Sequence, residues 1–240
     1  MSNVKFNFKY KKSIYLLIFL FFTVFVLLFG LYLFIINKNK FALFEAFNNK
    51  NNKNNNIILI GDSILNNSVY VFENESVPDL IKNKMQPEQL FYNFAKDGAT
   101  IQDCITHLEN IPEDKMSAIN ALKTDTSIFV SAGGNDILNS RNSESTINAL
   151  FEKYIKLITA IKKTFPLKNI VVLNLYYPLK PSFKMFYPFI KQWNELLEAN
   201  QEKNSYQVLK IDSIIVDSDD IIYDVEPSFK GGKKIAASIV

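Results

Sequence analysis

Short apolar runs alternate with stretches of helical spacing from residue 57 to the C-terminus. A short continuous apolar run between turn residues is typical of a fully buried parallel strand. Such runs predict strands over residues 57–61, 90–94, 127–132, 170–175 and 208–211. Helical spacing and start signals predict helices near 76–85, from 101 onwards, over 143–165, near 187–202 and over 232–240. This alternation indicates an α/β fold, a three-layer α/β/α sandwich around a parallel five-stranded sheet.

The first 56 residues follow a different pattern. Ser13 to Ile36 is a run of 24 residues without charge, and a helix across a bilayer core needs about 20 apolar residues. The run is too long for a signal peptide and lacks the small residues of a cleavage site. We therefore expect a basic arm at 1–12, a transmembrane helix at 13–36, an Asn- and Lys-rich linker at 37–56 and one folded domain at 57–240. Four Lys precede the run, which favours a cytoplasmic N-terminus and a domain on the extracytoplasmic or lumenal side.

Charge and composition narrow the classes of function. Residues 1–56 carry eight Lys and one Glu, a net +7, whereas residues 57–240 carry 19 basic and 23 acidic residues, a net −4, which together give the chain's +3. The folded part therefore has no basic excess that would indicate a nucleic-acid partner. A single cysteine, Cys104, excludes a disulfide within the chain, and a single histidine, His107, argues against a multi-histidine metal centre.

Three of the predicted strands end in turns that carry candidate catalytic groups. The first strand ends in Gly61-Asp62-Ser63, the turn after the second contains Gly98, and the third ends in Gly133-Gly134-Asn135-Asp136. In open α/β sheets, ligands bind beyond the carboxyl ends of the strands, which is where Ser63 would lie as a nucleophile. The backbone N–H groups of Ser63 and Gly98 and the side-chain amide of Asn135 could converge there as oxyanion donors.

These motifs resemble those of the SGNH hydrolases, also called the GDSL esterase/lipase family. The resemblance covers residues 57–240 and implies a flavodoxin-like sandwich in which Ser63 is the nucleophile. It also implies that Ser63, Gly98 and Asn135 form the oxyanion hole. Asp62 and Asp136 belong to the same turns and are expected to support the site. No metal or organic cofactor is expected.

The last motif of the family departs in this chain. The family carries Asp-x-x-His before a Pro and a helix, but here the position of the His holds Glu226 and that of the Asp holds Tyr223. Asp224 lies one residue later and could pair with Glu226 or remain a solvated turn residue. His107 belongs to the polar side of the helix from 101, and we interpret it as a solvated helical residue rather than a replacement base.

Glu226 could have either of two roles, and each role implies a different function for the chain. A buried carboxylate has a raised pKa and could take the serine proton, so the chain would be a serine esterase. Alternatively, Glu226 caps the final helix in a domain that has lost catalysis and binds a glycan or acyl ligand at the membrane. The ester could belong to a small molecule, a glycan or a lipid, and the aromatic segment 176–189 could line an acyl pocket, contact the membrane or pack on its own domain. The oligomeric state is left open.

Overall fold

The computed structural model describes residues 21–23, 56–122, 126–140, 144–166 and 168–240. The chain divides into two units, Met1–Lys53 and Asn54–Val240. In the first unit only Phe21–Thr23 are described, as helix. The predicted basic arm, most of the predicted transmembrane helix and nearly all of the linker therefore lie outside the described residues. Within the described ranges, no helix combines the length and the apolar character that crossing a membrane would need.

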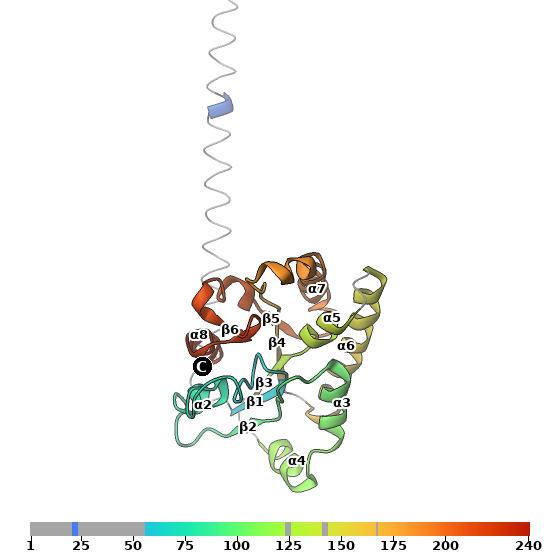
Figure 1. Ribbon diagram of the computed structural model, residues 1–240. Coiled ribbons are helices and arrows are strands. Elements are labelled where there is room, and N and C mark those ends of the chain that lie inside the picture. The colour runs from blue at the N-terminus through green and yellow to red at the C-terminus, as the bar shows by residue number, and fades with distance from the viewer. Residues whose placement is uncertain (1–20, 24–55, 123–125, 141–143, 167) are drawn as a thin grey trace, which may run out of the picture. The chain divides into compact units, whose positions relative to one another are not determined.

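A parallel sheet forms the centre of the second unit (Figure 1). Its strands are β1 (Asn56–Gly61), β2 (Phe91–Asn93), β3 (Thr126–Ser131), β4 (Asn169–Leu173) and β5 (Gln207–Leu209), in the order β2-β1-β3-β4-β5. Every residue of the central strands β1 and β3 is buried. Continuous apolar runs without alternation are what strands covered on both faces require. The predicted five-stranded parallel sheet is confirmed.

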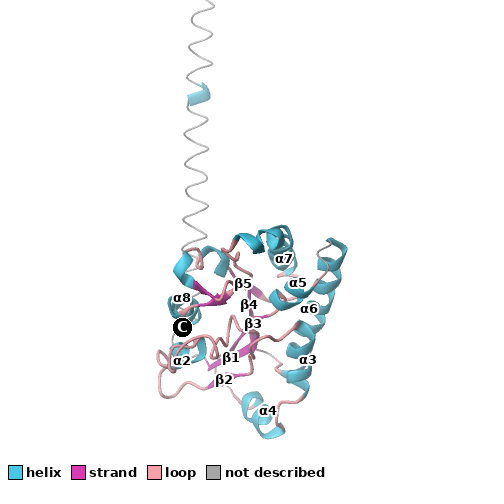
Figure 2. Cartoon of the chain, viewed as in Figure 1, coloured by secondary structure: helices cyan, strands magenta, loops and turns pink. Residues whose placement is uncertain are grey.

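Helices cover both faces of this sheet, as the cartoon shows (Figure 2). They are α2 (Val77–Lys82), α3 (Ile101–Glu109), α4 (Glu113–Asn120), α5 (Gly134–Asn139), α6 (Glu144–Thr164), α7 (Tyr187–Asn200) and α8 (Phe229–Ile239). One face carries α2 against α8, and the other carries α3 against α6, which also contacts α7. Five apolar residues of α6, together with Phe165 just beyond it, are buried at the predicted helical spacing: Ile147, Leu150, Tyr154, Ile158, Ile161 and Phe165.

Side-chain caps begin three of these helices. The hydroxyl of Ser76 accepts a hydrogen bond from Asp79 N at the start of α2, and Thr100 and Asp103 form a capping box at α3. Ser228 accepts from Gly231 N at 3.2 Å and starts α8. The sequence predicts that α8 begins at residue 232, but the Ser228 cap allows Gly231 and Gly232 to lie within the helix, where both are buried. This also makes the proposed capping role of Glu226 wrong, because Ser228 is the cap.

Three short elements were not predicted from the sequence. Helix α4 has only a few apolar residues. Helix α5 begins at Gly134 after Gly133, so no side-chain cap marks its start in the sequence. A two-stranded antiparallel ribbon, β6 (Ile221–Ile222) with β7 (Glu226–Pro227), precedes α8. Strands of two residues give no periodicity, so this ribbon has no signal in the sequence.

Candidate active site

Ser63 lies just beyond the carboxyl end of β1, the strand next to the middle strand β3 of the sheet. The turn depends on Gly61, whose φ of +147° is rarely adopted by residues with a side chain. A Cβ on Gly61 would lie 2.0 Å from the carbonyl oxygen of Ser131, so the close approach of β1 to β3 admits only glycine. The turn holds Ser63 almost fully buried, with 6% of its surface exposed.

Asp62 fastens this turn to the neighbouring strand. Its backbone N–H donates to Ser131 O at 3.0 Å, and its carboxylate Oδ1 accepts from the Ser131 hydroxyl and, at 3.1 Å, from Ile64 N. Burial raises the pKa of Asp62 to about 7, although the hydrogen bonds from Ser131 and Ile64 oppose the rise. Asp62 is therefore a structural support for the turn that carries Ser63, and Ser131 is a partner that sequence reasoning did not identify.

Asn135 belongs to the first turn of α5, beyond the end of β3. The turn before it needs Gly133, whose φ is +109° and whose Cβ would lie 2.3 Å from the Trp193 ring. The Asn135 amide nitrogen donates one hydrogen bond to Ala99 O at 3.0 Å. An amide nitrogen carries two hydrogens, so one N–H of Asn135 is left for a substrate oxygen.

Gly98 lies in the loop after β2, with a φ of +73°, and a Cβ added to it would meet no heavy atom within 4 Å. The bond from Asn135 to Ala99 O joins this loop to α5. Gly98 is exposed and does not line the cavity that contains Ser63. The structure thus places Gly98 outside the lining of this cavity, one residue before the carbonyl that accepts from Asn135.

Glu226 reaches Ser63 from the far end of the chain, on strand β7. It is half-buried, and its Oε2 has no hydrogen-bond partner among the described residues. Burial raises the pKa of Glu226, the nearby Ser63 hydroxyl lowers it by hydrogen bonding, and the charge of Asp97 raises it further. The net rise brings the carboxylate toward the range in which it can accept a proton near neutral pH.

The remaining sequence candidates lie beside this group. Asp224 is at the tip of the β6–β7 ribbon and forms an ion pair with Lys180 at 2.6 Å, so it is a turn residue rather than a partner of Glu226. Asp136 accepts from Ile101 N at 2.9 Å, which ties α5 to the start of α3. His107 is on α3, and burial and the charge of Lys96 lower its pKa.

One small cavity, of about 60 Å³, brings the nucleophile and its candidate partners together. Ser63, Asn135 and Glu226 line it, together with Asp62, Gly134 and mostly apolar side chains: Ile64, Ile137, Leu138, Leu175, Tyr176, Pro178, Ile190 and Val225. Residues from the ends of β1, β3 and β4 and from the ribbon thus meet in one place. Of the aromatic segment 176–189, Tyr176 and Pro178 contribute to this lining.

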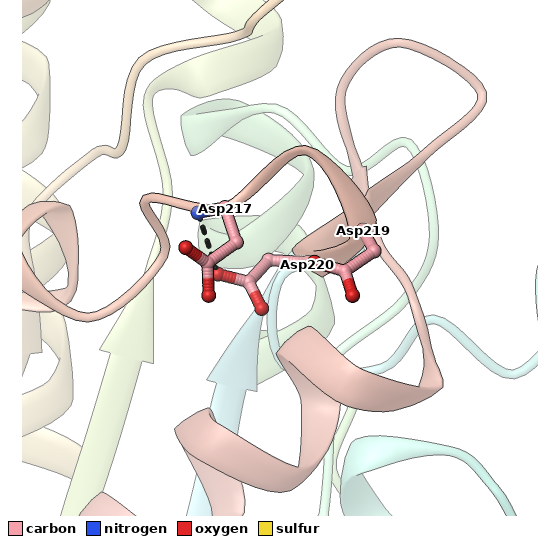
Figure 3. Close-up of side chains that lie close together, drawn as sticks. All are labelled: Asp217, Asp219 and Asp220. Atoms are coloured by element: carbon pink, nitrogen blue, oxygen red, sulfur yellow. Dashed lines mark hydrogen bonds between the residues drawn. The ribbon is translucent and has the colours of Figure 1, made fainter.

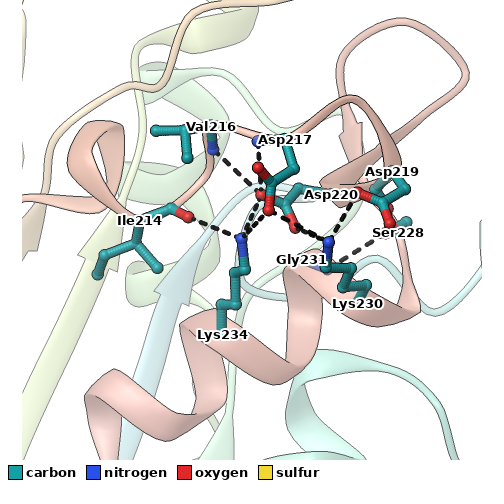
Figure 4. Close-up of polar contacts among 9 residues, drawn as sticks. All are labelled: Ile214, Val216, Asp217, Asp219, Asp220, Ser228, Lys230, Gly231 and Lys234. Carbon is teal, nitrogen blue, oxygen red and sulfur yellow. Dashed lines mark hydrogen bonds and ion pairs between the residues drawn. The ribbon is translucent and has the colours of Figure 1, made fainter.

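A second cluster of carboxylates lies away from the cavity, before the ribbon. Asp217, Asp219 and Asp220 each have an oxygen within 4.8 Å of the others (Figure 3). Lys234 donates to Asp217 at 3.0 Å and to Asp220 at 2.6 Å, and Lys230 donates to Asp219 at 2.8 Å (Figure 4). The two ammonium groups supply the positive charge that three close carboxylates need, so the cluster is a structural ion-pair network.

Comparisons with known proteins bear on the family and the fold of this chain. A family model described as GDSL-like lipase/acylhydrolase matches residues 57–234. A comparison with curated proteins finds no match. Similar solved structures include a lipolytic protein of the G-D-S-L family from Veillonella parvula, with 19% identity, a TM-score of 0.60, and coverage of 76% of this chain and 94% of that one.

Two further structures have the same fold. The lipase/acylhydrolase from Enterococcus faecalis has 19% identity and a TM-score of 0.55, with coverage of 77% of this chain and 93% of that one. A variant of an acetyl xylan esterase from Geobacillus stearothermophilus has 15% identity and a TM-score of 0.55, with coverage of 77% and 92%. The family match spans most of the chain and includes the turns of Ser63 and Asn135. The chain therefore belongs to the GDSL-like lipase/acylhydrolase family, which places it among the ester hydrolases.

Proposed function

We propose that this chain is a membrane-anchored serine hydrolase that cleaves an ester by acyl transfer through Ser63. The observation that carries the proposal is the shared cavity, in which the Ser63 hydroxyl, the Asn135 amide and the Glu226 carboxylate lie together among apolar side chains. A nucleophile, a proton acceptor and an oxyanion donor are the three groups that acyl transfer needs. Core packing alone would not require these three residue types at one place.

The reaction proceeds in two steps. Ser63 Oγ attacks the ester carbonyl carbon while its proton passes to Glu226, and the Ser63 N–H and the Asn135 amide hold the oxyanion. The tetrahedral intermediate collapses, the alcohol leaves with the proton from Glu226, and the acyl group remains on Ser63. Water then attacks the acyl-serine and gives a proton to Glu226. As the second tetrahedral intermediate collapses, the bond between the acyl carbon and Ser63 Oγ breaks, Glu226 returns the proton to Ser63 Oγ, and the carboxylic acid is released. The resemblance to the family assigns the Gly98 N–H to the oxyanion donors as well.

Glu226 takes the role of the base, which a histidine has in the family motif. An ordinary glutamate, with a pKa of about 4.3, is a weak base toward a serine hydroxyl. Burial and the neighbouring charge of Asp97 raise the pKa of Glu226, which strengthens it as a base. Activity should therefore rise with pH as Glu226 ionises, rather than follow the titration of an imidazole near pH ~6.5.

Hydrolysis of p-nitrophenyl acetate by the full-length chain in detergent tests this function. We expect Ser63→Ala to abolish the hydrolysis and to leave the far-UV circular dichroism unchanged. Ser68→Ala, at an exposed serine of the same loop, is the matched control and should keep the activity. If Ser63→Ala hydrolyses the ester as fast as the unchanged chain does, the proposal is wrong. A folded chain without activity on any ester would instead support a binding module.

The membrane anchor is part of the proposal and has its own test. It is supported by the 24 uncharged residues from Ser13 to Ile36 and by the four Lys before them. We expect the full-length chain to stay in the membrane pellet after extraction with alkaline carbonate. A chain that starts at residue 54 should appear in the supernatant. Release of the full-length chain by carbonate would contradict the anchor.

A further inference from the structure

The backbone around Glu226 has little rigidity of its own. Strands β6 and β7 have two residues each, and the tip between them holds Tyr223 and Asp224 at φ values of 49° and 73°. An isolated two-stranded ribbon is marginally stable at best in water. The position of Glu226 must therefore be set by contacts from outside the ribbon.

Two side chains supply such contacts, one on each side of Glu226. The Tyr176 hydroxyl donates to the carbonyl of Val225, and the Asn67 amide nitrogen donates to the carbonyl of Pro227 at 3.0 Å. Both donors come from elements that carry other parts of the site. Tyr176 follows β4 and lines the cavity, and Asn67 is four residues after Ser63 in the same loop.

Asn67 is held in place as firmly as a core residue. It is fully buried, its Oδ1 accepts from Val77 N at 2.8 Å, and its φ of 42° lies in the left-handed region that Asn tolerates. Both ends of its amide are thus bonded, which fixes the direction of the N–H that points at Pro227 O. Tyr176 is 5% exposed, and its hydroxyl donates to Val225 O.

We propose that Asn67 and Tyr176 are positioning residues that hold the Glu226 carboxylate on the Ser63 hydroxyl. This inference rests on the proposed function, because it gives Glu226 the role of base. A displacement of about 1 Å between reacting groups can cost about a hundredfold in rate. Each of the two hydrogen bonds fixes the carbonyl of a residue adjacent to Glu226. Losing either bond should therefore let the Glu226 carboxylate move by about 1 Å.

The test measures the rate at which a fluorophosphonate probe labels the full-length chain in detergent. Asn67→Asp keeps the size of the side chain and removes the donor to Pro227, and Tyr176→Phe removes only the hydroxyl. We expect each variant to label about ten- to a hundredfold more slowly than the unchanged chain. Two matched controls should label at the normal rate. They are Tyr206→Phe, which removes a buried hydroxyl bonded to Leu197 O at 2.8 Å, and Asn56→Asp, at a buried Asn of β1.

The decisive comparison repeats both substitutions in a Glu226→Gln background. If Asn67 and Tyr176 act through Glu226, they should change the slow residual labelling by less than about twofold, because coupled residues are not additive. Equal slowing in both backgrounds, or rates in the single variants that match the controls, would overturn the inference and leave the proposed function standing. Absence of labelling at Ser63 in the unchanged, folded chain would instead overturn the proposed function.

Discussion

At the scale of single residues, the site depends on glycines and carboxylates in unusual environments. Gly61 and Gly133 allow backbone approaches that no other residue would permit, and they place Ser63 and Asn135. Asp62 and Glu226 are acids with raised pKa values in or beside the cavity. The glycines could be predicted from the sequence as turn residues. Their close contacts could not, because Ser131 and Trp193 come from distant segments.

Replacing Gly61 by alanine should destabilise the fold severely. The new Cβ would overlap the Ser131 carbonyl oxygen, and the φ of +147° would be strained. We expect a loss in the free energy of unfolding of about 3 kcal/mol or more, among the larger effects of single substitutions. Gly98→Ala is the matched control, since its Cβ meets open space and its φ of +73° costs about 1–2 kcal/mol. Urea unfolding measures both, and equal losses would contradict the account.

The buried Asp62 should make the stability of the domain fall as pH rises. Its pKa is raised from 3.8 to about 7, so between these values the folded chain binds more protons than the unfolded chain. Its contribution to the free energy of unfolding therefore decreases from about pH 4 to pH 7, by at most ~1.4 kcal/mol per pH unit. Asp62→Asn cannot titrate and should lose this decrease, as urea unfolding at pH 5 and pH 8 would show. The same pH dependence in both chains would contradict the raised pKa.

At the scale of elements, the ribbon that carries Glu226 is held at its start by the ion-pair network around Asp220. Asp220 is fully buried, and its Oδ2 accepts from Lys234 Nζ at 2.6 Å, from Asp217 N at 2.9 Å and from Val216 N at 3.1 Å. Burial raises the pKa of Asp220, but these hydrogen bonds outweigh it and lower the pKa overall. The Asp220 carbonyl also accepts from Ser228 N at 2.9 Å, which joins the ribbon to the start of α8.

Removing the Asp220 carboxylate should therefore loosen this anchor. In Asp220→Ala, two backbone N–H groups lose their acceptor, and we expect a loss in the free energy of unfolding of about 2–3 kcal/mol. Lys180→Ala breaks an ion pair with Asp224 in which both side chains are largely exposed, 52% and 40%, and should cost at most ~1 kcal/mol. Denaturant unfolding of both variants makes the comparison. A smaller loss for Asp220→Ala than for Lys180→Ala would be inconsistent with the anchor.

At the scale of the whole molecule, the sheet was predictable and the ribbon was not. Long apolar runs such as Ile57–Ile60 identify buried parallel strands, and strand ends then bring Ser63 and Asn135 to one edge. Glu226 was expected to be at the site only through its place in the family motif. Asn67 contacts Pro227, 160 positions away, and Tyr176 contacts Val225, 49 positions away. A local sequence pattern cannot predict contacts between residues so far apart.

The most direct test of the account is where, and at what pH, a fluorophosphonate probe reacts with the full-length chain. Mass spectrometry of the digested protein should find the adduct on Ser63. The labelling rate should rise with pH as Glu226 ionises, at a pH above the ordinary range of a glutamate because burial raises its pKa. Glu226→Gln should slow the labelling and remove this pH dependence. A folded chain without an adduct on Ser63, or one whose labelling is unchanged in Glu226→Gln, would contradict the account.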